Sequence, residues 1–357
     1  MHIGTHLRGA GTKFVAALAL ALLLLTVRGT PCSAGGELLF PHPPEIQPNV
    51  DFWVKVFSSY SVRDFVILDR DNVSHVYQIF HLPGEGEPTR EDIDWSNAYL
   101  KAKYGDLLNR LASGREPENY DERRVAAMFK GQPLSAYAAA AENLRVQEGL
   151  KENFRNGLLR SRYYRPTMER IFRGAGLPPE LVTLAQVESG FEGGAKSGAG
   201  ALGIWQFTRA TGKEYLKISR YRDERLNPIR ETMAAARLLR SNYEELGDWP
   251  LAITAYNYGT GGIARAANEC EGDYCKMLKS YNGPRFGFAV KNYYAEFLAA
   301  LQIHNDEDSY FPGIEDEPTI TPRPVSEIIA HPRHRKSSVH RVSTHSHHHR
   351  RVGAQRA

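Results

Sequence analysis

Leu181–Phe191 of this chain reads LVTLAQVESGF, and the pair Pro178–Pro179 stands just before it. Proline is well tolerated in the first turn of a helix, so the pair suits a helix start. Leu181, Leu184 and Glu188 then follow at spacings of three and four, which places them on one helix face. The segment therefore predicts a helix that carries a single carboxylate on an otherwise apolar stripe.

A carboxylate in that position has both a chemical and a structural explanation. Because burying a charge is costly, a carboxyl group among apolar side chains tends to have a raised pKa. An acid that is still protonated near neutral pH can give its proton to a leaving oxygen. A single Glu on an apolar face more often lies at a helix end or pairs with an Arg, so spacing alone leaves the role of Glu188 open. The glycines from Gly190 to Gly203 predict a loop whose backbone lies close to a neighbouring group, and Ile204–Phe207 follows this loop.

Four segments, taken in order, resemble the four motifs of the family 1 soluble lytic transglycosylases. Pro178–Phe191 is similar to the first motif, and Gly203–Gln206 is similar to the second, in the Trp-containing form typical of the membrane-bound D type. Ala255–Asn257, with the glycines after it, resembles the third motif, and Lys291–Tyr294 resembles the fourth less closely. The resemblance covers about residues 140–300 and, more loosely, the segment upstream.

The resemblance implies a mainly α fold: a lysozyme-like α-helical catalytic domain, preceded by a helical segment with a small α+β N-terminal region. The residue pattern agrees, since residues 51–90 mix aromatic and β-branched residues typical of a short helix and two strands. From about residue 95 the helical period dominates, and Leu144, Leu150 and Leu158 follow it more loosely. We expect four regions: a signal peptide at 1–34, an accessory region at 35–140, the catalytic domain at 141–310 and a disordered tail at 315–357.

The resemblance also implies the roles of individual residues. Glu188 is the expected catalytic acid and base. The expected substrate-binding residues lie in the motifs or at a fitting distance from this acid: Ser189, Ser197, Trp205, Gln206, Tyr256, Asn257 and Tyr293. Four of them also have a structural explanation: a core position for Trp205, a backbone hydrogen bond for Ser189, and helix packing for Tyr256 and Asn257. Tyr294 is the alternative to Tyr293, because the fourth motif aligns in either of two registers.

A site with a single carboxyl group suits the lytic transglycosylase reaction better than ordinary glycoside hydrolysis. Ordinary glycosidases use two carboxyl groups that flank the bond, whereas the lytic transglycosylases that the chain resembles need one. Such an acid protonates the glycosidic oxygen between N-acetylmuramic acid and N-acetylglucosamine, and the C6 hydroxyl of the muramoyl residue then closes a 1,6-anhydro ring. The resemblance implies a reaction with no metal and no cofactor, and peptidoglycan glycan strands as the partner.

Two other functions remain open on the sequence. A lysozyme-like muramidase on the same scaffold would need a second carboxyl group beside a water, for which Glu192, Asp223 and Glu224 are the candidates. Like the last two, Glu231 lies outside the motifs. A non-catalytic peptidoglycan-binding protein would need no acid, and the presence of Glu188 together with the other motif residues argues against it.

Charge and the N-terminus indicate an exported protein. The 357 residues carry a formal charge of +4, but residues 36–320 hold 34 basic and 40 acidic residues, which argues against a nucleic-acid enzyme with a basic folded domain. Arg8 and Lys13 precede the uncharged run Phe14–Val27, which is too short to span a bilayer and is typical of a signal peptide. We expect a periplasmic protein whose membrane contact is limited to this segment. Acylation of Cys32, for which the preceding proline is unfavourable, and an uncleaved anchor are the alternatives.

The remaining cysteines, Cys270 and Cys275, have four residues between them. In an oxidising compartment such a pair can close a short disulfide loop, and two reduced thiols are the alternative. A metal site is not expected there, because no further Cys or His is near. The tail holds 7 of the 13 His, including His347–His349, but no carboxylate or thiol cluster accompanies them. We therefore expect an incidental solvated tail rather than a metal site.

Overall fold

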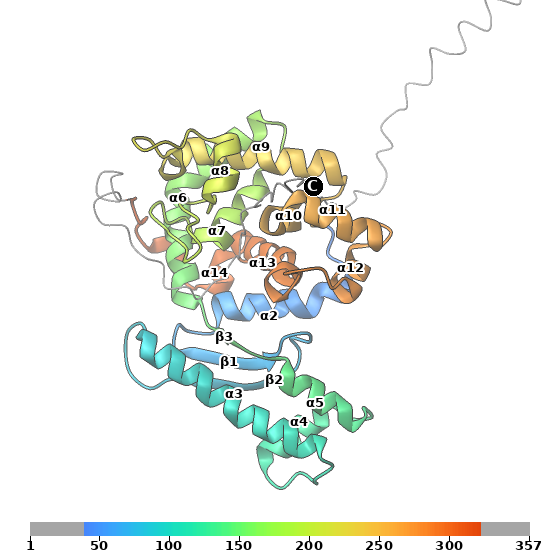
Figure 1. The fold of residues 1–357 in the computed structure, drawn as a ribbon. Coiled ribbons are helices and arrows are strands. Elements are labelled where there is room, and N and C mark those ends of the chain that lie inside the picture. Colours follow the sequence, from blue (N-terminus) through green and yellow to red (C-terminus); the bar gives the residue numbers. More distant parts are fainter. Residues whose placement is uncertain (1–38, 323–357) are drawn as a thin grey trace, which may run out of the picture. The chain divides into compact units, whose positions relative to one another are not determined.

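The computed structural model describes residues 39–322 (Figure 1). The predicted signal peptide, Cys32 and residues 323–357 of the predicted tail lie outside these residues. The first residues of that tail are ordered instead, since Glu317 pairs with Arg155 and the N–H of Ile320 donates to the carbonyl oxygen of Leu159. Residues 42–322 belong to one unit of backbone contacts. Its described part contains a small antiparallel sheet with covering helices and a larger helical body, which confirms the mainly α class with a small α+β region.

The small sheet has three antiparallel strands in the order β2-β1-β3. Its first two strands, β1 (Asp64–Asp69) and β2 (Val76–His81), form a hairpin, and helix α2 (Gln47–Ser58) precedes them, as the sequence predicts. The third strand, β3 (Leu144–Glu148), pairs with the other edge of β1 from a distant part of the chain. The buried strand β1 is therefore central.

The looser helical period through Leu144 was a wrong prediction. Leu144 begins β3, and the next helix starts only at Lys151. The error has a physical reason, because the backbone groups of this five-residue segment find their partners on β1 and not within the segment itself. Such a pairing leaves no local periodic signal.

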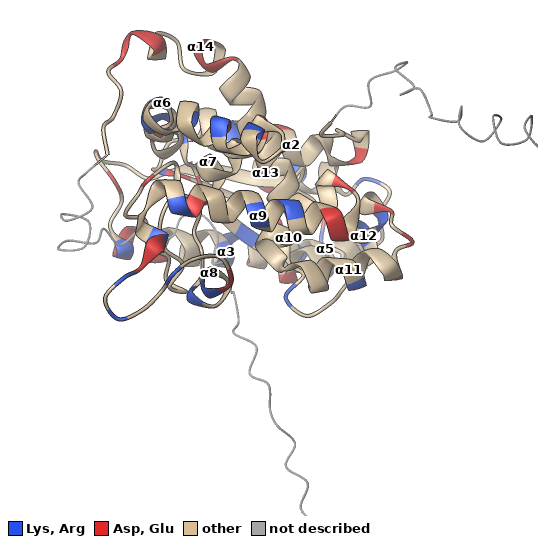
Figure 2. Cartoon of the chain, turned by 90° about the horizontal axis from the view of Figure 1, so that it is seen from above, with Lys and Arg blue, Asp and Glu red and all other residues tan. Residues whose placement is uncertain are grey.

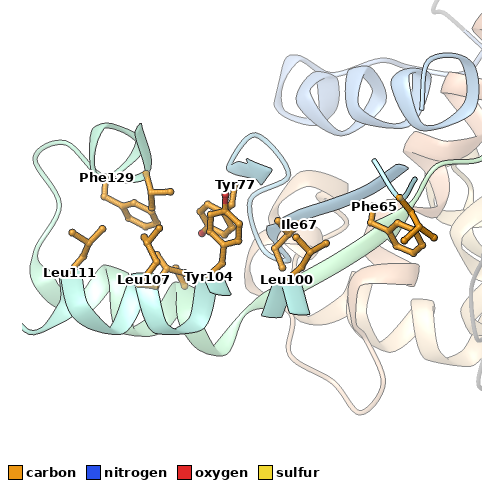
Figure 3. Packing of buried hydrophobic residues seen from close by; sticks show 12 residues of the cluster. Phe65, Ile67, Tyr77, Leu100, Tyr104, Leu107, Leu111 and Phe129 are labelled. Atoms are coloured by element: carbon orange, nitrogen blue, oxygen red, sulfur yellow. The ribbon is translucent and has the colours of Figure 1, made fainter. Parts of the chain in front are cut away.

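Three helices complete the core that the sheet begins: α3 (Arg90–Ala112), α4 (Tyr120–Met128) and α5 (Leu134–Glu142). Helix α3 starts with a capping box, in which Thr89 and Asp92 satisfy each other's backbone N–H groups. The cluster of buried side chains that joins these helices to the sheet includes Phe65, Ile67, Tyr77, Leu100, Tyr104, Leu107, Leu111 and Phe129 (Figure 3).

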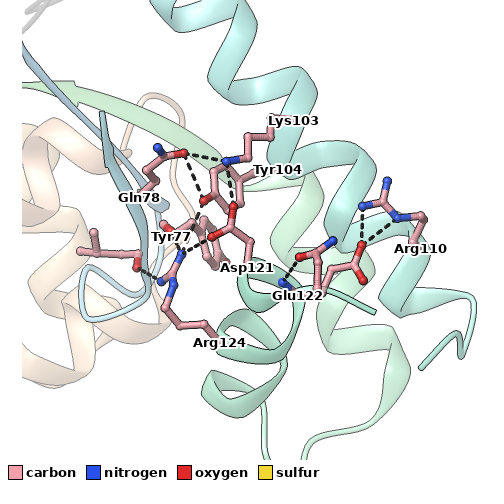
Figure 4. Close-up of polar contacts among 10 residues, drawn as sticks. Tyr77, Gln78, Lys103, Tyr104, Arg110, Asp121, Glu122 and Arg124 are labelled. Carbon is pink, nitrogen blue, oxygen red and sulfur yellow. Dashed lines mark hydrogen bonds and ion pairs between the residues drawn. The ribbon is translucent and has the colours of Figure 1, made fainter. Parts of the chain in front are cut away.

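Polar side chains join β2, α3 and α4 beside that core (Figure 4). Lys103 on α3 pairs with Asp121 at 2.8 Å and donates to the side-chain oxygen of Gln78 at 3.1 Å. Arg110, also on α3, pairs with the buried carboxylate of Glu122 at 2.6 Å. These contacts tie α4 to α3 and to the edge strand of the sheet.

The larger helical body follows β3 directly. Gly149 lies at the junction, where a Cβ would overlap the backbone oxygens of Tyr60 and Ser61, so only glycine fits. The 3-10 turn η1 (Pro44–Ile46) precedes α2. The elements of the body after the junction are α6 (Lys151–Gly174), η2 (Pro179–Thr183), α7 (Leu184–Ser189), α8 (Arg209–Tyr215), η3 (Glu224–Leu226), α9 (Pro228–Leu246), α10 (Trp249–Tyr258), α11 (Thr260–Glu269), α12 (Tyr274–Ser280), α13 (Phe288–Asn305), α14 (Glu307–Tyr310) and η4 (Ile314–Asp316).

Helix α13 is the buried centre of this body and packs against α2, α7 and α10. Its Asn292 accepts hydrogen bonds through Oδ1 from the indole of Trp53 at 3.1 Å and from the amide of Asn49 at 2.9 Å. Both donors belong to α2. A helix that precedes the sheet in the sequence is thus part of the helical body.

None of the helices within residues 39–322 has the combined length and apolarity that crossing a bilayer requires. The predicted membrane contact falls on the N-terminal segment, which lies outside these residues.

Candidate active site

The helix that carries the predicted acid is shorter than the sequence indicates. Pro178–Pro179 lead into the 3-10 turn η2, and α7 covers only Leu184–Ser189. It ends because Gly190 adopts a left-handed conformation, φ 58°, which glycine reaches without strain. Beneath it, α7 crosses α6 at Gly157, where a Cβ would overlap the side-chain amide of Gln186. Glycine at this crossing fixes the position of α7.

The carboxyl group of Glu188 is partly exposed and contacts a buried tyrosine. Its Oε1 accepts a hydrogen bond of 2.5 Å from the hydroxyl of Tyr293 on α13. Burial, followed by the charges of Glu188 and Tyr256, raises the pKa of Tyr293 well above its ordinary value, so the hydroxyl stays protonated and donates. Tyr294, the alternative in the fourth motif, packs instead against Tyr274, with ring centroids 5.6 Å apart. The structure therefore brings Tyr293 to the acid.

A second tyrosine lies near the same carboxyl group. The hydroxyl of Tyr256, on α10, donates to the carbonyl oxygen of Trp205 at 2.9 Å. Burial, followed by the charges of Glu188 and Glu231, raises the pKa of Tyr256 well above its ordinary value. Two neutral phenols thus lie within electrostatic reach of the Glu188 carboxyl group.

The glycine-rich segment after α7 folds back on itself, as the sequence predicts for a loop. Backbone bridges join Lys196 to Leu202 and Leu202 to Phe207. Ser197 lies at the tip of this fold, and its Oγ accepts the backbone N–H of Ala201 at 3.0 Å. The loop is therefore closed by its own hydrogen bonds, with the Ser197 side chain partly exposed.

Gln206 lies at the end of the loop with a φ of 51°. Its Nε2 donates to the carbonyl oxygens of Ala195 at 3.1 Å and Gly203 at 2.7 Å, so both amide hydrogens have partners in the loop. The Oε1 of the same side chain accepts no hydrogen bond from the described residues and is the part of Gln206 left for a ligand. The predicted substrate residue therefore also holds the loop in shape.

Glu231 on α9 supports the turn of the second motif, a role that the sequence analysis missed. Its carboxyl group is wholly buried, and Oε2 accepts the backbone N–H of Ile204 at 2.9 Å. Burial raises the pKa of Glu231 well above its ordinary value and outweighs the hydrogen bonds to Ile204 and Trp205, which lower it. The neighbouring Thr232 accepts the indole N–H of Trp205 at 3.0 Å. Two successive side chains of α9 thus hold the motif from below.

The sequence did contain a signal for Glu231. Glu231, Ala235, Leu239 and Asn242 lie at spacings of four, four and three, and all are buried. A carboxyl group on the apolar face of an amphipathic helix is the same pattern that drew attention to Glu188. Periodicity applied to α9 would have found it.

Asn257, next to Tyr256 on α10, has an amide that is only partly satisfied. Its Nδ2 is buried and has no hydrogen-bond partner among residues 39–322. A buried donor without a partner costs about 1–3 kcal/mol. A ligand that places an acceptor beside Nδ2 removes this cost, so Asn257 is a candidate for substrate binding.

Comparison with protein families matches the Transglycosylase SLT domain to residues 170–283. The membrane-bound lytic murein transglycosylase D of Escherichia coli (strain K12) is 38% identical over 133 residues, which are 35% of this chain and 29% of that protein, and the same protein from Escherichia coli O6:H1 gives the same figures. A putative tributyltin chloride resistance protein from Alteromonas sp. (strain M-1) is 30% identical over 151 residues, 42% of this chain and 72% of that protein.

The chain belongs to the SLT transglycosylase family. This confirms the family that the four motifs indicate. The residues matched to the SLT domain include Glu188, Gln206 and Tyr256 and end before Tyr293 on α13. The chain spans less than a third, 29%, of the length of the Escherichia coli relatives that it matches.

Trp205 and Ser189, two predicted substrate-binding residues of the SLT domain, make contacts within the protein. Trp205 is fully buried and stacks on Phe172 of α6, with ring centroids 5.5 Å apart. Ser189 is buried, and its hydroxyl donates to the carbonyl oxygen of Ile204 at 2.7 Å. Both side chains are buried, which favours the core role for Trp205 and the backbone role for Ser189 over contact with a sugar. The two residues join α6, α7 and the second motif.

Each candidate for a second acid in the SLT domain is paired with an arginine. The pairs are Glu192 with Arg160 at 3.4 Å, Asp223 with Arg225 at 2.7 Å and Glu224 with Arg222 at 2.6 Å. The pKa of Glu224 is lowered, first by the backbone N–H of Lys217 and then by Arg222. A carboxylate held in an ion pair is a weaker base toward water, which disfavours these three for hydrolysis.

The predicted disulfide is corrected as well, because Cys270 and Cys275 are both free thiols. Cys270 is buried at the end of α11, and its Sγ lies 3.8 Å from the hydroxyl of Ser280. Cys275 lies in the first turn of α12, where burial and then the charge of Glu45 raise the pKa of its thiol. The two sulfurs thus meet different neighbours despite their short separation in sequence. Neither belongs to a metal-binding cluster within the described ranges.

Proposed function

We propose that this chain is a peptidoglycan lytic transglycosylase. It cleaves the β-1,4 bond between N-acetylmuramic acid and N-acetylglucosamine and forms 1,6-anhydromuramic acid, with Glu188 as the single acid and base. The observation that carries the proposal is the 2.5 Å hydrogen bond from Tyr293 to Glu188, at a site built largely from an SLT domain. The names of the Escherichia coli relatives, lytic murein transglycosylases, support the substrate class.

Glu188 acts first as the general acid. Because its Oε1 accepts from Tyr293, we assign the transferable proton to Oε2. This proton passes to the glycosidic oxygen as the bond from that oxygen to C1 of the muramoyl residue breaks, and the N-acetylglucosamine side leaves as an alcohol. The acetamido group of the muramoyl residue stabilises the positive charge at C1. The hydrogen bond from Tyr293 strengthens as the carboxyl group becomes charged, because charge-assisted hydrogen bonds are the stronger ones.

Glu188 then acts as the base. Its carboxylate takes the proton of the muramoyl C6 hydroxyl while that oxygen attacks C1. The new bond from the C6 oxygen to C1 closes the anhydro ring, and Glu188 ends protonated, as it began. No water is consumed. The nucleophile belongs to the substrate itself, so the reaction gains the high effective molarity of an intramolecular step.

We assign the substrate contacts to three polar side chains around the acid. The Nδ2 of Asn257, which lacks a partner among the described residues, suits the carbonyl oxygen of an N-acetyl group. The Oε1 of Gln206 suits a hydroxyl or an amide N–H, and the partly exposed Ser197 extends the same loop toward the reacting sugar. Tyr256 positions the second motif through its hydrogen bond to the Trp205 carbonyl.

We also propose that the protein works in the periplasm on peptidoglycan strands. The helical body, which includes α2 as well as the helices from Lys151 onward, is the proposed catalytic region, and the small sheet with α3–α5 is the proposed accessory region. The signal-like segment before residue 35 and the excess of acidic over basic residues between the two ends support export and argue against a nucleic-acid partner. The name of the membrane-bound relatives supports a place at the cell wall.

The chemical form of the product tests the proposal. Purified sacculi are digested with the protein, and the soluble muropeptides are analysed by mass spectrometry. We expect products that end in 1,6-anhydromuramic acid, each lighter by one water than the hydrolytic product, and a rate that a chelator does not change. Reducing-end muramic acid as the main product would overturn the proposal in favour of a muramidase.

A further inference from the structure

A cavity of about 790 Å³ opens beside α9, away from the residues of the proposed active site. The end of α6, helix α8 and the segment from Leu216 to Glu224 form its other walls. On α9 the cavity is lined at Ile229, Met233 and Arg240, which lie on the opposite side of the helix from Glu231. One face of α9 thus supports the second motif, and the other face is open to a ligand.

The floor of the cavity is apolar. Ile229 and Met233 remain 44% and 45% exposed, although both are large hydrophobic side chains on a helix of the body. Ile171 of α6 and Ala236 of α9 continue the apolar lining. The volume lies in the range of roughly 300–1,000 Å³ that is typical of small-ligand sites.

The rim of the cavity is strongly basic. Six cationic side chains line it against two carboxylates, those of Glu214 and Glu224. The Glu224 carboxylate is already engaged, since its Oε1 pairs with Arg222 at 2.6 Å and its Oε2 accepts the backbone N–H of Lys217 at 2.7 Å. Figure 2 shows Lys and Arg on both α8 and α9.

Three of the cations have no partner for their charge. The side chains of Lys213, Lys217 and Arg240 form no ion pair and no hydrogen bond within the part of the chain that the structure describes, whereas the charge of Arg230 acts on Glu224. Like charges gathered around a low-dielectric hollow repel one another and focus a positive potential into it. An anionic ligand relieves this repulsion, and a neutral ligand does not.

We propose that this cavity binds a ligand that carries several carboxylates together with small apolar groups. The inference rests on the proposed function in one respect: the ligand we name is the peptide stem of the peptidoglycan strand, whose carboxylates and methyl groups match the rim and the floor. A concave site suits a discrete ligand of this kind better than the flat surface of a membrane. Occupation of the cavity would hold a peptide-bearing strand to the protein at a point other than the Glu188 site.

Direct binding tests the site without any turnover. The probe is the free stem tetrapeptide L-alanyl-γ-D-glutamyl-meso-diaminopimelyl-D-alanine, titrated calorimetrically into the full chain. We expect saturable binding that weakens as salt is added, because exposed charges are screened. The double variant Lys213→Gln/Arg240→Gln should bind at least about tenfold more weakly, since it removes two of the unpaired charges.

Two further variants keep the test specific. Met233→Trp fills the floor without removing a charge and should also weaken binding. Lys101→Gln/Arg115→Gln removes two equally exposed and unpaired cations outside the cavity and should leave binding unchanged. Absence of tetrapeptide binding, or binding that all variants share, overturns the proposal. Binding to phosphatidylglycerol vesicles that the cavity variants lose, with no binding of tetrapeptide, overturns it in favour of a membrane contact.

An activity measurement separates this inference from the proposed function. The parent should release anhydro products faster from peptide-bearing sacculi than from glycan strands whose stems an amidase has removed. Lys213→Gln/Arg240→Gln should lose this preference and keep the parent's rate on the stripped strands. No anhydro product from either substrate would reject the proposed function, whereas anhydro products without a preference would reject the cavity proposal alone.

Discussion

The carboxyl group of Glu231 occupies the space in which a side chain at Gly203 would begin. A Cβ at Gly203 would overlap both Oε1 of Glu231 and the carbonyl oxygen of Arg225. The backbone of Gly203 also adopts a φ of 87°, which L side chains rarely reach. The turn of the second motif and the acid beneath it therefore fit together only with glycine at this position.

Gly203→Ala should destabilise the fold substantially. The positive φ and the overlap with a buried carboxyl group each cost about 1–3 kcal/mol, so we expect a loss of about 2–6 kcal/mol in the free energy of unfolding. Urea unfolding followed by circular dichroism measures it. Gly198→Ala is the control, because it lies in the same loop with no atom within 4 Å of an added Cβ. Equal losses in the two variants would contradict the close fit to Glu231.

Glu188→Gln should nearly abolish turnover and leave the fold intact. The amide keeps the shape of the side chain but neither gives nor takes the required proton. Loss of general acid–base catalysis costs roughly 10²–10⁴-fold, and here one residue serves both steps. Release of muropeptides from sacculi gives the rate, and the circular dichroism spectrum checks the fold. Digestion at the parent's rate would show that another group is the acid.

Tyr293→Phe should lower kcat by roughly 10–100-fold with little change in KM, because a hydrogen bond to a charged group contributes about 1.5–3 kcal/mol. The bond from Tyr293 to Glu188 matters most when the carboxyl group is ionised, between the two chemical steps. Tyr294→Phe is the matched control on the same helix. It removes the hydroxyl of a buried ring that packs against Tyr274 and not against Glu188, so it reports on stability alone. If both variants lose activity in proportion to stability, Tyr293 has only a packing role.

His304 should make stability depend on acidity. Burial lowers the pKa of His304 to about 4, and its Nδ1 lies 2.6 Å from a guanidinium nitrogen of Arg165, a donor to the neutral ring. The unfolded value is about 6.5. Because the folded pKa is the lower one, the unfolded chain binds more protons between these values, and the contribution of the neutral ring is complete above pH 6.5 and lost as the pH falls toward 4.

The measurement for His304 is a comparison of two pH profiles. Between pH 7 and pH 4 the parent should lose about 3 kcal/mol more of its free energy of unfolding than His304→Gln, which does not titrate there. Burial also raises the pKa of Glu148 to about 7, but this group titrates in both proteins and cancels in the difference. Parallel profiles for the two proteins would mean that folding does not lower the pKa of His304.

Much of the site was predictable, because helical spacing locates the acid and the order of the motifs locates its neighbours. The spacing of Leu181, Leu184 and Glu188 places the acid on its helix, and the motif order supplies Tyr256 and Tyr293 from distant helices. Sequence did not separate residues that meet a substrate from those that support them. Trp205 and Ser189 are as much part of the motifs as Gln206, and only their packing favours the core and backbone roles.

The two wrong predictions, for β3 and for the disulfide, depend on which groups meet in the folded chain. β3 exists because β1 offers a free edge, and no pattern within Leu144–Glu148 reports that edge. The spacing of Cys270 and Cys275 permits a disulfide, but the turn between α11 and α12 directs the two thiols to different neighbours. Such relationships depend on the assembled backbone and cannot be read from intervals along the chain.

The position of α2 on α13 changes how this protein can be shortened. A fragment that begins at residue 141 would lack the indole of Trp53 and leave one flank of α13 open to water. The sheet and α3–α5 lie instead between two neighbouring points of the backbone, since the N–H of Lys151 donates to the carbonyl oxygen of Tyr60 at 3.0 Å. The sheet and α3–α5 are therefore an insertion between Tyr60 and Lys151, two residues of the helical body that lie side by side. To delete this insertion, a short linker should join Tyr60 directly to Lys151, and residues 44–60 should be kept.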